Sequence, residues 1–75
     1  MIAQRSVTDL KKGESAVISV FLRKDFAAKL HTLGLKPNEI VEMVRYSPFG
    51  QSLYLKVNGQ FIALRKEEAN SIIIE

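Results

Sequence analysis

The sequence of 75 residues has no cysteine and no tryptophan, and it contains one histidine, two prolines and four glycines. Without cysteine, neither a disulfide framework nor a cysteine-ligated zinc site can hold the chain together. A chain this short buries only about 60% of the surface that its unfolded form exposes. We therefore expect one small domain, residues 1–75, whose stability comes from packing alone.

Long apolar runs are also missing. No run approaches the roughly 20 residues of a transmembrane helix, and MIAQRSVTDLKKG lacks the pattern of a signal peptide. We therefore expect a cytoplasmic protein without direct membrane insertion. Eleven Lys and Arg against eight Asp and Glu give a net charge of +3. These charges are scattered, whereas nucleic-acid binders concentrate them on one face, so no DNA partner is expected.

Catalytic and metal sites lack the residues they need. Nucleophilic catalysis requires an activated Ser or Cys beside a base, and His31 is the single histidine. There is no Gly-rich phosphate loop, so we expect no enzyme. A metal site needs two to four ligands, and near His31 in sequence the carboxylates are those of Asp25, Glu39 and Glu42, of which Glu39 and Glu42 are the weak candidates. We interpret His31 as a surface residue and expect no cofactor, with weak binding of a divalent ion as the alternative.

Stretches rich in β-branched and apolar residues predict about five short strands. The clearest are the two arms of LYLKVNGQFIAL, because Asn58-Gly59 is the sequence of a type I′ hairpin turn. This turn fixes the register and leaves Tyr54 and Phe61 on the non-core face. The core face then carries Leu53, Leu55, Val57, Ile62 and Leu64. The remaining strands are expected at residues 15–22, 40–46 and 71–75.

One short α-helix is predicted between the first two of these strands. Its apolar stripe consists of Phe26, Leu30 and Leu33. Asp25 is a suitable N-cap, Gly34 stands where a left-handed residue ends a helix, and Pro37 prevents the helix from resuming. Residues 65–70 predict an additional helical turn that buries Ala69. Such elements are best arranged as a small, mainly β barrel, whose closure would remove exposed sheet edges.

Aromatic side chains outside the expected core raise two alternatives. Phe49 lies beside Pro48 in the loop SPFGQS, and Tyr54 and Phe61 share the outer hairpin face. Either flanking segments cover these rings, or the rings form an exposed patch that binds a partner. Tyr54, Phe61 and Lys56 could also form a platform that stacks RNA bases, but we regard an RNA partner as the least favoured of these alternatives.

Three segments, LKKGESAVISV, KLHTLGLKPNEIVEMV and SPFGQSLYLKVNGQFIALRKEEANSIII, resemble the FeoA family in this order. The resemblance covers about Ser6 to Ile74. It implies an SH3-like barrel with one short helix and one additional helical turn. It further implies a noncatalytic cytosolic protein that accompanies the bacterial ferrous-iron transporter FeoB and modulates its uptake. By the same resemblance, Leu33, Gly34, Leu35 and Pro37 form a structural corner whose leucines point inward.

The resemblance also implies a partner, the cytosolic GTP-binding region of a FeoB-like transporter, through which the protein would be peripheral at the inner membrane. The candidate contact residues are Ser47, Pro48, Phe49, Gly50 and Tyr54, with Lys29 and Lys36 as steering charges. The family usually has arginine where Lys29 stands, and lysine lacks the bidentate fork. The same barrel forms the C-terminal domain of DtxR-type repressors, so binding or sensing of a transition metal such as ferrous iron is the alternative function.

Overall fold

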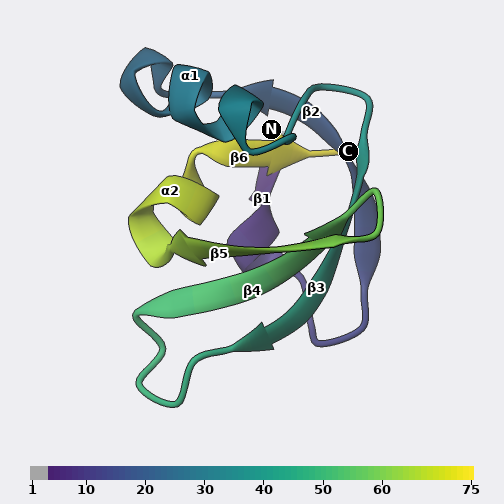
Figure 1. The fold of residues 1–75 in the computed structure, drawn as a ribbon, viewed down its shortest axis with the longest axis vertical. Helices are drawn as coiled ribbons and strands as arrows, with labels where there is room; N and C mark the ends of the chain where they lie inside the picture. Colours follow the sequence, from purple (N-terminus) through teal and green to yellow (C-terminus); the bar gives the residue numbers. More distant parts are fainter. Residues whose placement is uncertain (1–3) are drawn as a thin grey trace.

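The structure, a computed structural model, describes residues 4–75 as a curved antiparallel sheet with α1 at one end and α2 at one side (Figure 1). The strands are β1 (Arg5–Ser6), β2 (Ser15–Phe21), β3 (Ile40–Tyr46), β4 (Ser52–Val57), β5 (Gln60–Arg65) and β6 (Ile72–Ile74). The helices are α1 (Lys24–Thr32), α2 (Lys66–Asn70) and the short 3-10 helix η1 (Val7–Asp9). The mainly β class is confirmed. The sheet has six strands rather than about five, because the sequence did not predict the two-residue β1.

The sheet has the strand order β1-β6-β2-β3-β4-β5, with every neighbouring pair antiparallel. Within the described residues no pairing joins β5 back to β1, so β5 keeps a free edge. The expectation that closure removes all exposed edges is therefore wrong. The chain leaves β5 directly into α2, and β6 then pairs with β1 and β2 instead.

The β4–β5 hairpin has the register that the sequence predicts. Val57 pairs with Gln60 across the turn, and the pairing continues without a bulge to Ser52 and Arg65. Asn58 has a positive φ of 52°, as a type I′ turn requires. The five apolar side chains assigned to its inner face are all buried. Tertiary packing and turn chemistry therefore agree on one register.

The N-terminal segment contributes more to the core than its sequence suggests. Val7 of η1 and Leu10 just after it are both buried. A capping box holds η1 in place, because the Asp9 carboxylate accepts the Ser6 N–H at 2.9 Å and Ser6 Oγ accepts the Thr8 N–H at 3.3 Å. The adjoining β1 covers β6, which explains why the three consecutive isoleucines of β6 are all buried.

Helix α1 begins two residues earlier than expected. Arg23, not Asp25, is the N-cap, and it makes no side-chain capping bond. Its guanidinium binds the Asp25 carboxylate at 2.5 Å and lies 4.3 Å from the centre of the Phe26 ring. These contacts place Asp25 inside the first turn, where the helix dipole favours a carboxylate. The hydrogen bond from Arg23 lowers the pKa of Asp25.

The corner after α1 is a Schellman motif. Gly34 adopts φ = 98°, its N–H donates to the His31 carbonyl at 3.0 Å, and the Leu35 N–H donates to the Leu30 carbonyl at 2.9 Å. Leu30 and Leu35 are fully buried, whereas Leu33 is only half-buried. The chain then turns again through Pro37 and enters β3.

Glu68 links the two helices. Glu68 is only 4% exposed. Its carboxylate accepts the Arg65 N–H at 3.0 Å and forms an ion pair with Lys29 Nζ at 2.5 Å. The bond from Lys29 is the main reason that the pKa of Glu68 lies below its ordinary value; burial acts in the opposite direction, and the Arg65 N–H adds to the lowering. Lysine at position 29 therefore forms a specific ion pair despite lacking the arginine fork.

We expect Gly34→Ala to lower the free energy of unfolding by about 1 kcal/mol, because an L-residue with a Cβ is strained at positive φ. Apart from Gly34 and its two chain neighbours, no atom of residues 4–75 lies within 4 Å of the position that a Cβ would occupy, so crowding adds nothing. Gly34→Asn is the matched control, since asparagine tolerates this conformation. Urea unfolding of both variants provides the measurement, and equal losses would show that the backbone conformation is not the cause.

We expect Glu68→Gln to lower the free energy of unfolding by about 1 kcal/mol at pH 7, a modest figure because Lys29 is largely exposed. Since the folded-state pKa is lowered, the stabilisation by the carboxylate is complete above pH 4.5 and is lost as pH falls through the lowered value. Urea unfolding from pH 7 to acid should show the difference between wild type and variant shrinking below pH 4.5. A difference that is constant with pH would contradict this assignment.

Candidate functional site

The β3–β4 loop is a defined turn. Pro48 and Phe49 occupy its two central positions, and the Gly50 N–H donates to the Ser47 carbonyl at 3.0 Å. Serine first, proline second and glycine last are the residues that type I turns favour. Ser47 also contacts the start of β4 twice, through its N–H to the Ser52 carbonyl at 2.9 Å and through its Oγ, which accepts the Ser52 N–H at 3.2 Å. The turn is therefore ordered before any partner arrives.

Both ends of this loop are braced by other parts of the chain. The Tyr46 hydroxyl donates to the Thr8 carbonyl of η1 at 2.6 Å. Burial, together with the nearby Asp9 charge, raises the pKa of Tyr46, so the phenol keeps its proton and continues to donate. At the other end, the Lys66 N–H donates to the Gln51 carbonyl at 3.0 Å.

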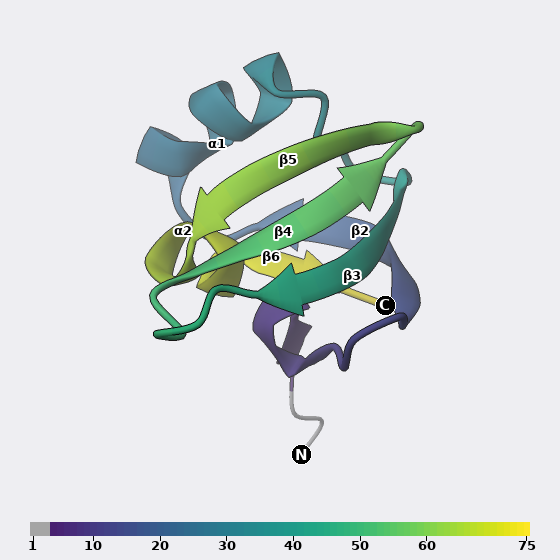
Figure 2. The same cartoon turned by 60° about the horizontal axis from the view of Figure 1, so that its bottom comes forward.

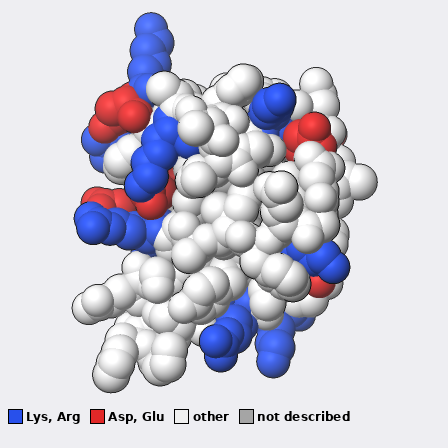
Figure 3. All heavy atoms as spheres, in the orientation of Figure 1, with Lys and Arg blue, Asp and Glu red and all other residues white. Residues whose placement is uncertain are grey.

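The tip of the loop is apolar and exposed. Phe49 is 89% exposed, the highest value among the exposed large hydrophobic residues of the described chain, and Pro48 beside it is exposed as well. Residues 46–51 contain no charged side chain. The corresponding lower-left part of the surface protrudes and carries no blue or red (Figure 3). Of the two alternatives for Phe49, the structure therefore shows the uncovered ring.

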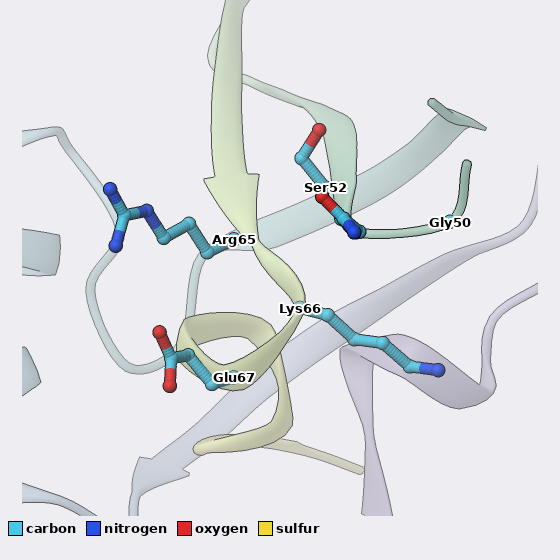
Figure 4. Close-up of a pocket in the computed structure, with 6 residues that line it drawn as sticks. Gly50, Ser52, Arg65, Lys66 and Glu67 are labelled. Carbon is cyan, nitrogen blue, oxygen red and sulfur yellow. The ribbon is translucent and has the colours of Figure 1, made fainter. Parts of the chain in front are cut away.

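An open hollow of about 630 Å³ adjoins the loop. It is lined by Gly50, Gln51, Ser52, Arg65, Lys66 and Glu67. Arg65 and Lys66 project in different directions from the junction of β5 and α2, and Glu67 points toward Arg65 (Figure 4). The two cations do not converge on one point, so the hollow is a depression beside the loop rather than a pocket for a small anion.

The other predicted contact residues lie elsewhere. Tyr54 is half-buried on the outer face of β4, with the Arg45 guanidinium 5.2 Å from the centre of its ring. Lys29 belongs to α1 and is paired with Glu68, and Lys36 lies exposed between α1 and β3. Helix α1 is at the end of the molecule opposite the β3–β4 loop in Figure 1, and the two are also apart in Figure 2. The structure thus joins Ser47, Pro48, Phe49 and Gly50 but separates both lysines from them.

The candidate metal ligands do not form a cluster. His31 is exposed in the last turn of α1, whereas Glu39 precedes β3 and Glu42 lies within it. Residues 4–75 contain no group of three or more His, Cys, Asp or Glu side chains that could hold a metal ion. The site that the structure does build, an apolar anchor on a rigid turn, is suited to recognition of a surface.

Sequence reasoning missed the supports of this site. The order Ser-Pro-Phe-Gly is itself a turn signal and could have identified the turn. The bond from Tyr46 to Thr8 joins residues 38 apart in sequence, and no local pattern indicates it. No local sequence pattern indicates the hollow formed by β4, β5 and α2 either.

The helices of residues 4–75 are short. None of them is both long and apolar enough to cross a bilayer.

Comparison with known proteins gives a consistent result. The model of the FeoA domain matches residues 5–75. Iron(II) transport protein A from Clostridium thermocellum is 30% identical with a TM-score of 0.87, and the match covers 95% of this chain and 44% of that one. FeoA from Stenotrophomonas maltophilia, an SH3 domain protein solved with zinc, is 29% identical with a TM-score of 0.80, covering 95% and 89%. No curated protein matches the chain.

The same fold occurs in a different class of protein. A manganese-dependent transcriptional repressor with bound manganese has a TM-score of 0.87 at 10% identity, and the match covers 100% of this chain and 37% of that one. At this identity the likeness shows the fold alone. The family match spans all but the first four residues of the chain. This SH3-like protein therefore belongs to the FeoA family.

Proposed function

We propose that this protein is a noncatalytic accessory protein of ferrous iron transport. It binds the cytosolic GTP-binding region of a FeoB-like transporter and modulates uptake. Membership of the FeoA family supports the link to iron transport, and the Stenotrophomonas maltophilia relative is described as a candidate ferrous iron transport activating factor. The observation that carries the proposal is the exposed Phe49 on its braced turn.

The energetics of the loop favour this role. Complete burial of a phenylalanine side chain against a partner contributes about 2 kcal/mol or more. Ordering a flexible loop normally opposes binding, but the turn around Phe49 is already fixed by bonds from Ser47, Tyr46 and Lys66. Most of the burial energy is therefore available for affinity.

Modulation follows from differential binding. An accessory protein shifts a transporter toward the conformation that it binds more tightly. In this proposal iron is the cargo of the transporter, and the accessory protein needs no cofactor of its own. The protein would act in the cytoplasm and reach the inner membrane through its partner. Its net charge of +3 would assist encounter with an acidic surface, with Lys36 among the contributing charges.

Metal sensing is not adopted as a second function. The candidate ligands His31, Glu39 and Glu42 are not part of any group of three ligands within the described residues. The likeness to manganese-dependent repressors concerns the fold, which by itself does not carry a function.

We expect Phe49→Ala to weaken binding to the soluble GTP-binding domain of the cognate transporter by about 20-fold, because it removes the apolar anchor. Isothermal titration calorimetry provides the measurement, and thermal unfolding checks that the exposed substitution leaves the fold intact. Ile40→Ala is the control, since Ile40 is also an exposed apolar residue (61%) but lies at the start of β3.

Two results would count against the proposal. Equal affinities for wild type and Phe49→Ala would remove the loop from the interface. Absence of binding by the wild-type protein at saturating concentration would exclude the GTP-binding domain as its partner.

A further inference from the structure

We propose that the free edge of β5 is a second binding site, which takes an extended acidic peptide segment of a partner protein as an added strand. This goes beyond the proposed loop contact and does not rest on it. β5 is the last strand in the sheet order, and Figure 2 shows no strand on its outer side. Addition of a strand to such an edge is a recurrent mode of peptide recognition.

The hairpin geometry determines which backbone groups face outward. In a hairpin with a two-residue turn, the pair that flanks the turn exchanges both of its hydrogen bonds, and hydrogen-bonded pairs then alternate along the strands. Val57–Gln60, Leu55–Ile62 and Leu53–Leu64 are these pairs. The N–H and C=O groups of Phe61 and Ala63 therefore point away from β4. None of the backbone bonds between elements of the described chain involves either residue.

This edge lacks three of the usual protections against added strands, although Figure 2 shows α1 on the outer side of β5. Natural edges are blunted by proline, by bulges or by very short strands. β5 has six residues without proline, and its register with β4 is continuous, unlike the pairings of β2 with β6 and of β3 with β4. Only its C-terminal end is closed, because the Arg65 N–H donates to Glu68.

The side chains around the edge select the chemistry of the added segment. Phe61 is 69% exposed and offers an apolar contact, with Lys56 Nζ 5.6 Å from the centre of its ring. Lys56, Arg65 and Lys66 are all exposed along or just beyond the hairpin, and of these residues none forms an ion pair within the described chain. A segment that alternates acidic and apolar side chains matches this surface. A second copy of the chain would instead bring the same cations together.

The edge leads toward the loop site. Arg65 and Lys66 follow the open part of β5 and line the hollow beside Gly50 and Gln51. An added segment that runs past the end of β5 would therefore pass over two cations on its way to the Phe49 turn. This continuity allows one partner to occupy both sites, although each site can be tested separately.

The test is an NMR titration of the isotope-labelled protein with a synthetic peptide of about eight residues that alternates Glu and Val. At about 1 mM peptide we expect saturable amide shifts and slowed amide exchange centred on Phe61 and Ala63. A peptide alternating Lys and Val should bind at least about tenfold more weakly, and the acidic peptide methylated on its backbone nitrogens should give no such shifts. Shifts of equal size from the methylated peptide, or none from the acidic peptide, would overturn the proposal.

Variants of the protein provide an independent test of the added-strand geometry. Ala63→Pro removes an outward N–H that makes no bond to β4 and should abolish the shifts, since proline is tolerated at such edge positions. Ala63→Ser keeps the N–H and should retain them. If Ala63→Pro does not fold, the methylated peptide on the wild-type protein decides the question. Retained binding by folded Ala63→Pro would contradict the added-strand geometry.

Further measurements distinguish peptide binding at the edge from binding at the loop, from self-association and from nucleic-acid binding. Phe49→Ala should leave binding of the peptide unchanged, and a loss there would place the peptide at the loop instead and overturn the edge assignment. Analytical ultracentrifugation tests for self-association, and a dimer abolished by Ala63→Pro would assign the edge to a second copy and overturn the peptide assignment. Stronger shifts at Tyr54 and Phe61 with single-stranded RNA than with the peptide would also overturn it.

Discussion

The carboxylate of Glu68 is the constraint on which the arrangement of the C-terminal half depends. One oxygen accepts the Arg65 N–H and the other pairs with Lys29, so a single side chain ends β5, starts α2 and holds α1. A buried carboxylate without partners would be strongly unfavourable. Both partners must therefore be in place when the chain folds. By using the last outward N–H of β5, Glu68 also sets where the free edge stops.

Local sequence rules predicted the parts of the fold that local chemistry decides. Asn58-Gly59 admits one hairpin register, and the apolar alternation on either side requires the same register, so the pairing was predictable residue by residue. The corner at Gly34 is similar, because its hydrogen bonds lie within six residues of chain. In both places turn chemistry and burial point to one conformation, and no distant contact is needed to choose it.

Features that depend on distant partners could not be predicted in this way. The N-cap is an exception, because Arg23 replaces Asp25 there and its contacts with Asp25 and Phe26 are local, so the sequence rule for caps was wrong without any distant partner. Val7 is buried because β1 pairs with the last strand of the chain. The SH3-like barrel was predicted correctly, but its complete closure was not found: α2 separates β5 from β6 along the chain, and β1 and β5 remain the two edge strands of the described sheet. The last two outcomes are decided by where the two ends of the chain meet.

The candidate site also combines features that the local sequence predicts with features that depend on distant contacts. The apolar character of Pro48 and Phe49 was visible in the sequence, but whether a neighbouring segment covers the ring was a tertiary question. The structure answers it through Tyr46, whose bond to η1 fixes the start of the loop and leaves the tip projecting. Phe49 is therefore exposed on a part of the molecule that is anchored from both sides. If both proposals hold, the apolar tip and the open strand edge would give this small protein two distinct ways to bind, one through a side chain and one through its backbone.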